Sequence, residues 1–153
     1  MPTIFTKGDI LNTHGLRTYA HGCDCAGGMD VGVGVAFKKK WPRMFEAYRA
    51  RCAEGRFRLG DVLAWNEGDE LIYTLGIQEH STKKAKVPAL TQSLKTMAEL
   101  ALVAGIDRVG LPRIGAGPAG LDWPRVKKIL SEIGQETSVT LVVFEQFIRE
   151  KPA

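Results

Sequence analysis

The stretch "GLPRIGAGPAGLDWPRV" (residues 110–126) connects an apolar segment to an amphipathic one through a loop rich in glycine. Glycine loses more conformational entropy on folding than any other residue, so glycines gathered in one loop need a physical reason. The usual reasons are a tight turn or a ligand that must lie against the backbone. The loop follows a predicted buried strand and precedes a predicted helix, which is a common position for a binding loop in α/β proteins.

Outward from this loop, the spacing of apolar residues switches repeatedly between strand-like and helix-like. The spacing predicts strands over 3–9, 17–23, 61–66, 70–77, 107–112 and 138–147, and helices over 33–41, 42–53, 87–105 and 122–134. The tight "NEGD" turn between 61–66 and 70–77 is typical of a hairpin. This order predicts an α/β fold with a mixed, largely parallel sheet, in which a ligand lies beyond the carboxyl ends of the strands.

Length and composition favour one soluble globular domain over residues 1–153, with 44% hydrophobic and 25% charged residues. Because no apolar run approaches the roughly 20 residues of a membrane span, we expect no membrane contact. The N-terminal residues lack the pattern of a secretory signal. Three cysteines (Cys23, Cys25 and Cys52) are too few for a disulfide framework, so we expect a cytoplasmic protein. No heptad pattern indicates assembly, and we expect a monomer.

The chain carries a formal net charge of +4, much of it in the basic stretches 37–43, 49–58 and 81–86. Runs of this length usually form solvated helix faces, but they are also compatible with contact to nucleic acid. Composition leaves both interpretations open.

A second glycine-rich loop, "HGCDCAGGMDVGVGVAF" (21–37), also follows a predicted strand and leads into a predicted helix. Both loops offer closely spaced backbone N–H groups near a helix N-terminus, an arrangement that stabilises phosphate oxygens. Neither loop has the Gly-Lys-Ser/Thr of a Walker A motif or a complete dinucleotide-binding fingerprint. On composition alone, two turns without a ligand remain an alternative.

Four segments together resemble the macrodomain family: "KGDIL" (7–11), "AHGCDCAGGM" (20–29), "GVGVAFKKKWP" (32–42) and "LPRIGAGPAGLDW" (111–123). They occur in the family's order and are most similar to its branch of terminal ADP-ribose protein glycohydrolases and DNA ADP-ribosyl glycohydrolase antitoxins. The resemblance implies a three-layer α/β/α macrodomain with one ADP-ribose cleft at the carboxyl edge of the sheet.

Carried over residue by residue, the resemblance implies that Asp9 and Ile10 contact adenine and that the ring of Phe144 packs against it. It places Gly115, Ala116 and Gly117 along the diphosphate. The other implied ligand-binding residues are Gly22, Cys23, Gly28, Met29, Gly32, Val33, Gly34, Ile114, Pro118, Ala119 and Gly120. Without the resemblance, Asp9 is more typical of an Asx turn after a strand, and Phe144 is more typical of a core residue.

The predicted catalytic residues are the ionisable members of the first loop, His21, Asp24 and Asp30, which would lie beside the distal ribose. The family usually has Asn in place of Asp24 and Gly in place of Asp30, so each substitution adds a candidate general base or acid. Each also adds negative charge near a diphosphate. As an alternative, Asp24 bonds its own loop backbone.

The branch's glycohydrolases attack the anomeric carbon with a lysine, and Gln78 stands at that position here. Lys83 and Lys84 follow without aligning to it. Their acidic partner's position falls on Ala119, and Asp122 is better explained as a helix cap. The remaining mechanism is attack by water on the anomeric carbon, assisted by Asp24, Asp30 or His21.

The cluster of His21, Cys23 and Cys25 lacks the Cys-x-x-Cys spacing of a zinc site, so we expect neither a metal nor a cofactor. The predicted function is a hydrolase that removes ADP-ribose from a modified protein or nucleic acid. The alternatives are a non-catalytic reader of free or terminal ADP-ribose, an ADP-ribose 1″-phosphatase, and a nucleic-acid binder that uses the basic stretches. The expected partners are ADP-ribose and ADP-ribosylated macromolecules.

Overall fold

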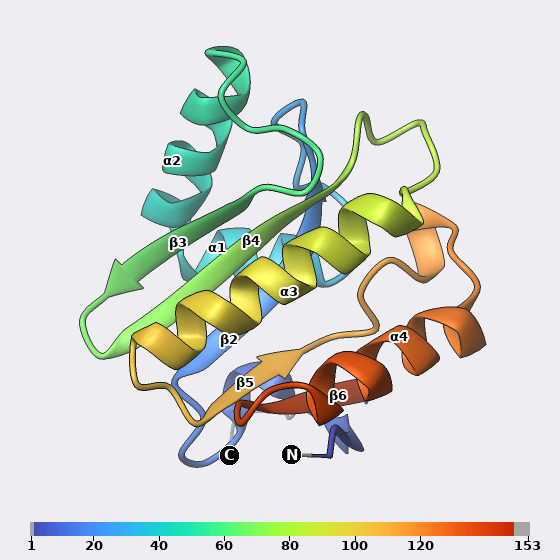
Figure 1. Cartoon of the computed structure of the whole chain (residues 1–153). Helices are drawn as coiled ribbons and strands as arrows, with labels where there is room; N and C mark the ends of the chain where they lie inside the picture. The colour runs from blue at the N-terminus through green and yellow to red at the C-terminus, as the bar shows by residue number, and fades with distance from the viewer. Residues whose placement is uncertain (1, 149–153) are drawn as a thin grey trace.

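The computed structural model describes residues 2–148, which form a six-stranded sheet with helices on both faces (Figure 1). The strands are β1 (Ile4–Gly8), β2 (Thr18–Asp24), β3 (Val62–Glu67), β4 (Glu70–Gln78), β5 (Arg108–Leu111) and β6 (Thr140–Phe147). The helices are α1 (Val33–Lys40), α2 (Pro42–Ala53), α3 (Val87–Val103) and α4 (Trp123–Gln135), with 3-10 turns at Ile10–Asn12 and Gly117–Ala119.

The strand order is β1-β6-β5-β2-β4-β3, and all neighbours are parallel except β3 and β4. The antiparallel pair is the hairpin that the "NEGD" turn predicts. The prediction of a mixed, largely parallel sheet is therefore confirmed. This order puts β2 and β5, the strands that precede the two glycine-rich loops, side by side in the middle of the sheet.

Two apolar cores separate the sheet from its helices. Leu94 of α3 and Leu130 of α4 are fully buried in the core on one face. Phe37 of α1, with Met44 and Tyr48 of α2, is fully buried in the core on the other face. The three-layer α/β/α architecture is thus confirmed. The sheet is the middle layer, and the two glycine-rich loops begin at the ends of its strands β2 and β5.

Helix boundaries follow the sequence signals closely. Pro42 occupies the first turn of α2 and separates it from α1, because a proline ring is compatible with a first turn but not with a helix interior. The carboxylate of Asp122 caps α4 by accepting a hydrogen bond from the Arg125 amide at 3.2 Å, as the sequence predicts. Pro42 and Asp122 thus fix the first turns of α2 and α4.

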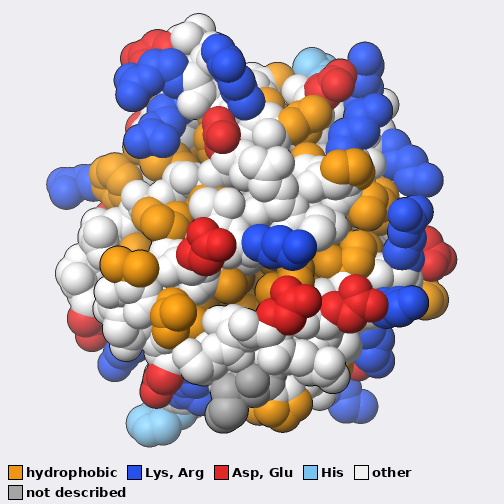
Figure 2. Space-filling model, viewed as in Figure 1, with side chains coloured by type: hydrophobic (Ala, Val, Ile, Leu, Met, Phe, Trp, Pro, Cys, Tyr) orange, Lys and Arg blue, Asp and Glu red, His pale blue; other side chains and the backbone are white. Residues whose placement is uncertain are grey.

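The surface is charged and mixed in sign. On the face shown in Figure 2, Lys and Arg side chains lie mainly toward the margins, with acidic side chains among them. Several cations of the three basic stretches form ion pairs, including Lys38 with Asp30 and Lys83 with Glu79. Within residues 2–148, no helix is both long and apolar enough to cross a membrane.

Candidate functional site

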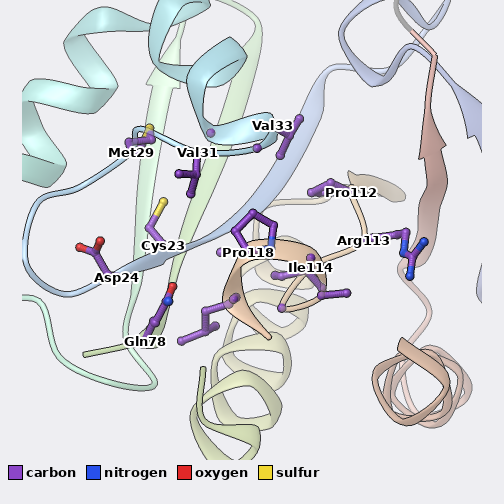
Figure 3. A pocket seen from close by; sticks show the side chains of 18 of the residues that line it. Cys23, Asp24, Met29, Val31, Val33, Gln78, Pro112, Arg113, Ile114 and Pro118 are labelled. Carbon is purple, nitrogen blue, oxygen red and sulfur yellow. The ribbon is translucent and has the colours of Figure 1, made fainter. Parts of the chain in front are cut away.

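A cleft of about 460 Å³ opens at the carboxyl ends of the parallel strands, between the loop after β2 and the loop after β5. Most of the predicted ligand-binding residues line it: Ile10, Gly22, Cys23, Gly28, Met29, Gly32, Val33, Gly34, Ile114, Gly115, Ala116, Gly117, Pro118, Ala119 and Phe144. Figure 3 shows Met29, Val31 and Val33 on one side and Pro112, Ile114 and Pro118 on the other. The structure therefore brings the two glycine-rich loops together, while the roles of these residues stay predictions.

Two predicted ligand-binding residues lie outside the lining of the cleft. Asp9 caps the 3-10 turn that follows β1, and its Oδ1 accepts a hydrogen bond from the Leu11 amide at 3.0 Å. Gly120 ends the second loop in a left-handed conformation with φ of 81°. Asp9 and Gly120 thus stabilise the ends of 3-10 turns, and their neighbours Ile10 and Ala119 line the cleft.

The second glycine loop keeps backbone donors available. Among the hydrogen bonds of the described residues, none uses the N–H of Gly115 or Gly117, whereas the Ala116 amide donates to the Arg113 carbonyl at 3.2 Å. Gly117 has φ of +70°, and a Cβ there would meet nothing within 4 Å. Bare backbone at this position therefore borders open space, as close approach by a ligand requires.

The first loop presents its donors at the start of α1. The first amides of an α-helix have no partner within the helix, and here they belong to residues 33 and 34, which line the cleft. The Val35 amide turns back to the Gly32 carbonyl at 3.3 Å. Cleft-lining residues on both sides thus carry amides without a hydrogen-bond partner among the described residues, and the positive end of a helix adds to their attraction for an anion.

At Gly22, the absence of a side chain is explained by packing and not by a ligand. A Cβ on Gly22 would lie 2.5 Å from Ile77 Cδ1 and 3.1 Å from Ile114 Cγ1. Gly22 therefore permits side-chain packing under the floor of the cleft.

Asp24 stands at the end of β2 and is almost completely buried. Its Oδ1 accepts hydrogen bonds from the amides of Ala26 at 2.8 Å and Gly28 at 3.1 Å, and from the hydroxyl of Tyr48 at 2.9 Å. Hydrogen bonding to the loop backbone is the alternative that the sequence leaves open for Asp24, and Oδ1 makes these hydrogen bonds. No buried polar side-chain atom of the described residues lacks a partner, so Oδ2, which has no such bond, retains contact with solvent.

His21, predicted to be catalytic, does not line the cleft. It is 1% exposed, its Nε2 lies 2.8 Å from Thr74 Oγ1, and its ring centroid is 4.5 Å from that of Phe37. Burial lowers its pKa to about 3, so the imidazole is neutral at physiological pH. The reason is the position of β2 in the sheet: helices cover both of its faces, and His21 points into the core under α1.

Asp30, the third predicted catalytic residue, lies at the rim of the cleft. Its side chain is 77% exposed, and its Oδ1 is 3.3 Å from Lys38 Nζ.

Sequence reasoning missed several residues of the cleft wall: Val31, Ile77, Ser81, Pro112, Arg113 and Glu145. Arg113 lies over the ring of Trp123, with 4.9 Å from guanidinium carbon to ring centroid. Glu145 accepts hydrogen bonds from Lys127 Nζ at 2.8 Å and Trp123 Nε1 at 3.1 Å, and the bond from Lys127 lowers its pKa. The apolar run of β6 gave no signal that Glu145 would face a cleft.

Gln78 occupies the end of β4 and lines the cleft, in the position where the resemblance places a nucleophilic lysine. Its side-chain amide donates to the Lys83 carbonyl at 2.6 Å. The Lys83 amine pairs instead with Glu79 on the surface, at 3.4 Å. The described residues therefore provide no lysine amine in the lining of this cleft.

The cysteines do not form a metal centre. Within residues 2–148, no group of three or more His, Cys, Asp or Glu side chains is placed to hold a metal ion. All three cysteines are free, and burial raises the pKa of Cys25 to about 12. A thiol with that pKa is protonated at neutral pH and is a poor nucleophile.

The sequence also matches a model of a known protein family, and this match agrees with the fold and the cleft. Residues 20–130 match the Macro domain family, and the chain belongs to that family.

Among curated relatives, a DNA ADP-ribosyl glycohydrolase of Mycobacterium tuberculosis is 25% identical over 145 residues, covering 92% of this chain but only 41% of the relative. The human ADP-ribose glycohydrolase OARD1 is 27% identical over 143 residues, covering 92% of this chain and 89% of the relative. The macrodomain of Thermus aquaticus DarG has the same fold, with a TM-score of 0.84, 24% identity, and coverage of 94% of this chain and 97% of that one. The chain is thus related to ADP-ribosyl glycohydrolases at about 25% identity.

Proposed function

We propose that the cleft binds ADP-ribose and that the protein hydrolyses the bond between ADP-ribose and a modified macromolecule. Adenine would lie toward Ile10 and Phe144, and the diphosphate would lie between the two glycine-rich loops. The distal ribose would then reach the ends of β2 and β4, at Asp24 and Gln78. The observation that carries this proposal is the pair of glycine-rich loops that line one cleft, each with residues whose amides have no hydrogen-bond partner in the described part of the chain.

The reaction would differ from covalent attack by lysine. Gln78 is neutral and cannot attack a carbon, so water would attack the anomeric carbon while the bound diphosphate holds the sugar in place. Asp24 is the best placed base, because it lines the cleft and its Oδ2 is not consumed by the loop. The relationship to two kinds of ADP-ribosyl glycohydrolase supports this class of reaction.

A non-catalytic reader of ADP-ribose is the second candidate, and a specific observation favours it. Asp24 Oδ1 already accepts three hydrogen bonds, and Asp30 is exposed and paired with Lys38. His21 is buried away from the cleft. With those groups occupied, Oδ2 of Asp24 is the carboxylate oxygen best placed to move a proton in the cleft, and a reader would not need it.

A 1″-phosphatase is the least favoured alternative. Asp24 and Asp30 would both face the added phosphate, and like charges at a shared site repel. Lys38 is paired with Asp30 and is therefore not free to bind the added phosphate.

Calorimetry with ADP-ribose and AMP tests the binding proposal first. We expect ADP-ribose to bind at least tenfold more tightly, because only ADP-ribose extends past the amides of both loops. Equal affinity for the two ligands would overturn the placement of diphosphate and distal ribose.

A hydrolysis panel then separates the enzyme from the reader. ADP-ribosylated protein and ADP-ribosylated DNA are incubated with the protein, and released ADP-ribose is measured. The informative variant is Asp24→Asn, because its amide oxygen still accepts the bonds from Ala26, Gly28 and Tyr48 while the basic group is lost. An enzyme that uses Asp24 as its base loses at least 100-fold in rate and keeps its affinity. Binding without release by the unmodified protein would establish the reader.

A further inference from the structure

The side-chain amide of Gln78 donates a hydrogen bond through its nitrogen, whereas its oxygen accepts none within the described residues. Its Nε2 lies 2.6 Å from the Lys83 carbonyl oxygen, and only the nitrogen end of the amide can approach a carbonyl oxygen so closely. This contact fixes the orientation of the amide. The oxygen, Oε1, must therefore point away from Lys83.

The unused oxygen keeps contact with the cleft. No buried polar side-chain atom of the described residues is without a hydrogen-bond partner, and no hydrogen bond uses Oε1 of Gln78. Since Gln78 is only 9% exposed and lines the cleft, the accessible part of its side chain faces that space. Figure 3 shows the amide end of the Gln78 side chain directed toward Cys23.

Gln78 and Asp24 occupy the same end of the cleft. The two residues are register partners at the ends of β4 and β2, and the Cys25 amide donates to the Gln78 carbonyl at 2.8 Å. Figure 3 shows both side chains at one end, with Arg113 at the opposite end. Because the loop occupies Oδ1 of Asp24, the acceptors at this end without a local backbone partner are Oδ2 of Asp24 and Oε1 of Gln78, and only the Gln78 oxygen is neutral.

We infer that Oε1 of Gln78 accepts a hydrogen bond from a hydroxyl of the distal ribose and so makes the cleft discriminate ADP-ribose from ADP. The inference rests on the proposed function, because it takes the diphosphate to lie between the glycine-rich loops. A ligand that ends at the second phosphate does not reach β4 and leaves the Gln78 oxygen to water. Gln78 is therefore a specificity-determining residue, and a neutral one, which adds no charge beside the anomeric carbon.

The test compares two ligands on three proteins by calorimetry. We expect Gln78→Met, which keeps the length of the side chain and removes its acceptor, to weaken ADP-ribose binding about fivefold to tenfold while ADP affinity stays within twofold. Gln78→Glu keeps an acceptor oxygen and adds a charge that both diphosphates feel alike. Its ratio of ADP-ribose to ADP affinity should therefore remain close to that of the unmodified protein.

Glu79→Gln is the matched control. It removes the partner of Lys83 on the same segment without touching the cleft lining, and it should change neither affinity. An equal loss for both ligands in Gln78→Met would mean that Gln78 acts only by anchoring the segment at Lys83, and the inference would be wrong.

The inference and the proposed function fail in different ways. If the unmodified protein binds neither ADP-ribose nor ADP, the proposed function fails. If it prefers ADP-ribose and Gln78→Met keeps that preference, the inference alone fails. Should Gln78→Met not fold, ADP-ribose analogues that lack one hydroxyl of the distal ribose replace it. Loss of preference for one analogue supports the inference, and undiminished binding of every analogue overturns it.

Discussion

The hydroxyl of Tyr48 on α2 lies 2.9 Å from Oδ1 of Asp24 at the end of β2. The same hydroxyl lies 2.9 Å from the carbonyl oxygen of Gly28, so one buried phenol holds both ends of the turn that begins the first glycine-rich loop. Burial raises the pKa of Tyr48, and the phenol keeps the proton that it donates. The shape of one wall of the cleft therefore depends on a residue that does not line it.

Removing this hydroxyl should loosen the loop. We expect Tyr48→Phe to lower the free energy of unfolding by about 1–2 kcal/mol, because the single phenolic proton shared by the Asp24 carboxylate and the carbonyl oxygens of Asp24 and Gly28 is lost. ADP-ribose affinity should fall severalfold as well. Urea denaturation and calorimetry measure the two effects.

Tyr19→Phe is the control for this variant. Tyr19 is also buried and donates to the Leu16 carbonyl at 2.9 Å, away from the cleft. It should cost comparable stability and leave affinity unchanged. Equal losses of affinity in both variants would contradict a specific role for Tyr48.

A methyl group at Gly117 should block the cleft. Both Gly117 and Gly105 have positive φ, +70° and +74°, and a Cβ at either would meet nothing within 4 Å. Alanine at each position should therefore cost a similar 1–2 kcal/mol of backbone strain. Only Gly117 lines the cleft, so only Gly117→Ala should also weaken ADP-ribose binding, by at least tenfold. Unchanged affinity in a folded Gly117→Ala protein would argue that no ligand lies along this loop.

Stability should depend on pH through His21. Its pKa is about 3 in the folded protein and about 6.5 in an unfolded chain. Between these values the unfolded chain binds more protons, so the free energy of unfolding should fall as pH is lowered from 6.5 toward 3. The contribution approaches about 1.4 kcal/mol per pH unit. Urea denaturation from pH 7 to pH 4 should show a shallower slope for His21→Gln, and parallel slopes would show that His21 is not the responsible group.

The cap of α4 should matter for stability and not for binding. Asp122→Ala removes the side-chain acceptor for the Arg125 amide and should lower the free energy of unfolding by about 1 kcal/mol. Asp122 is absent from the cleft lining, so ADP-ribose affinity should be unaffected. A large loss of hydrolysis with intact binding would instead give Asp122 a part in the reaction.

The sequence predicts the fold well because its signals are local. The "NEGD" turn, Pro42 and Asp122 each act within a few residues, and the structure has the hairpin, the helix start and the helix cap that they predict. The two glycine-rich loops also face each other, since both follow strands that are adjacent in the sheet.

The chemistry of the site depends on contacts that periodicity does not reveal. β2 is buried on both faces, so alternation could not say that His21 points into the core while Asp24 turns into the loop. Tyr48 has the helical spacing of an ordinary core residue, and nothing local marks its bonds across the chain to Asp24. The engagement of Gln78 by Lys83 likewise depends on how the segment after β4 folds back.

Tyr19 of β2 pairs directly with Gly110 of β5, although most of the chain separates them. Neither half of the polypeptide alone can assemble the space between the loops, so a molecule that occupies it recognises only the completed tertiary structure. Mass action then makes such a molecule a thermal protectant, whose melting-temperature shift grows with the logarithm of its concentration above the dissociation constant. Screening nucleotides by that shift would find occupants of the cleft without any assay of turnover.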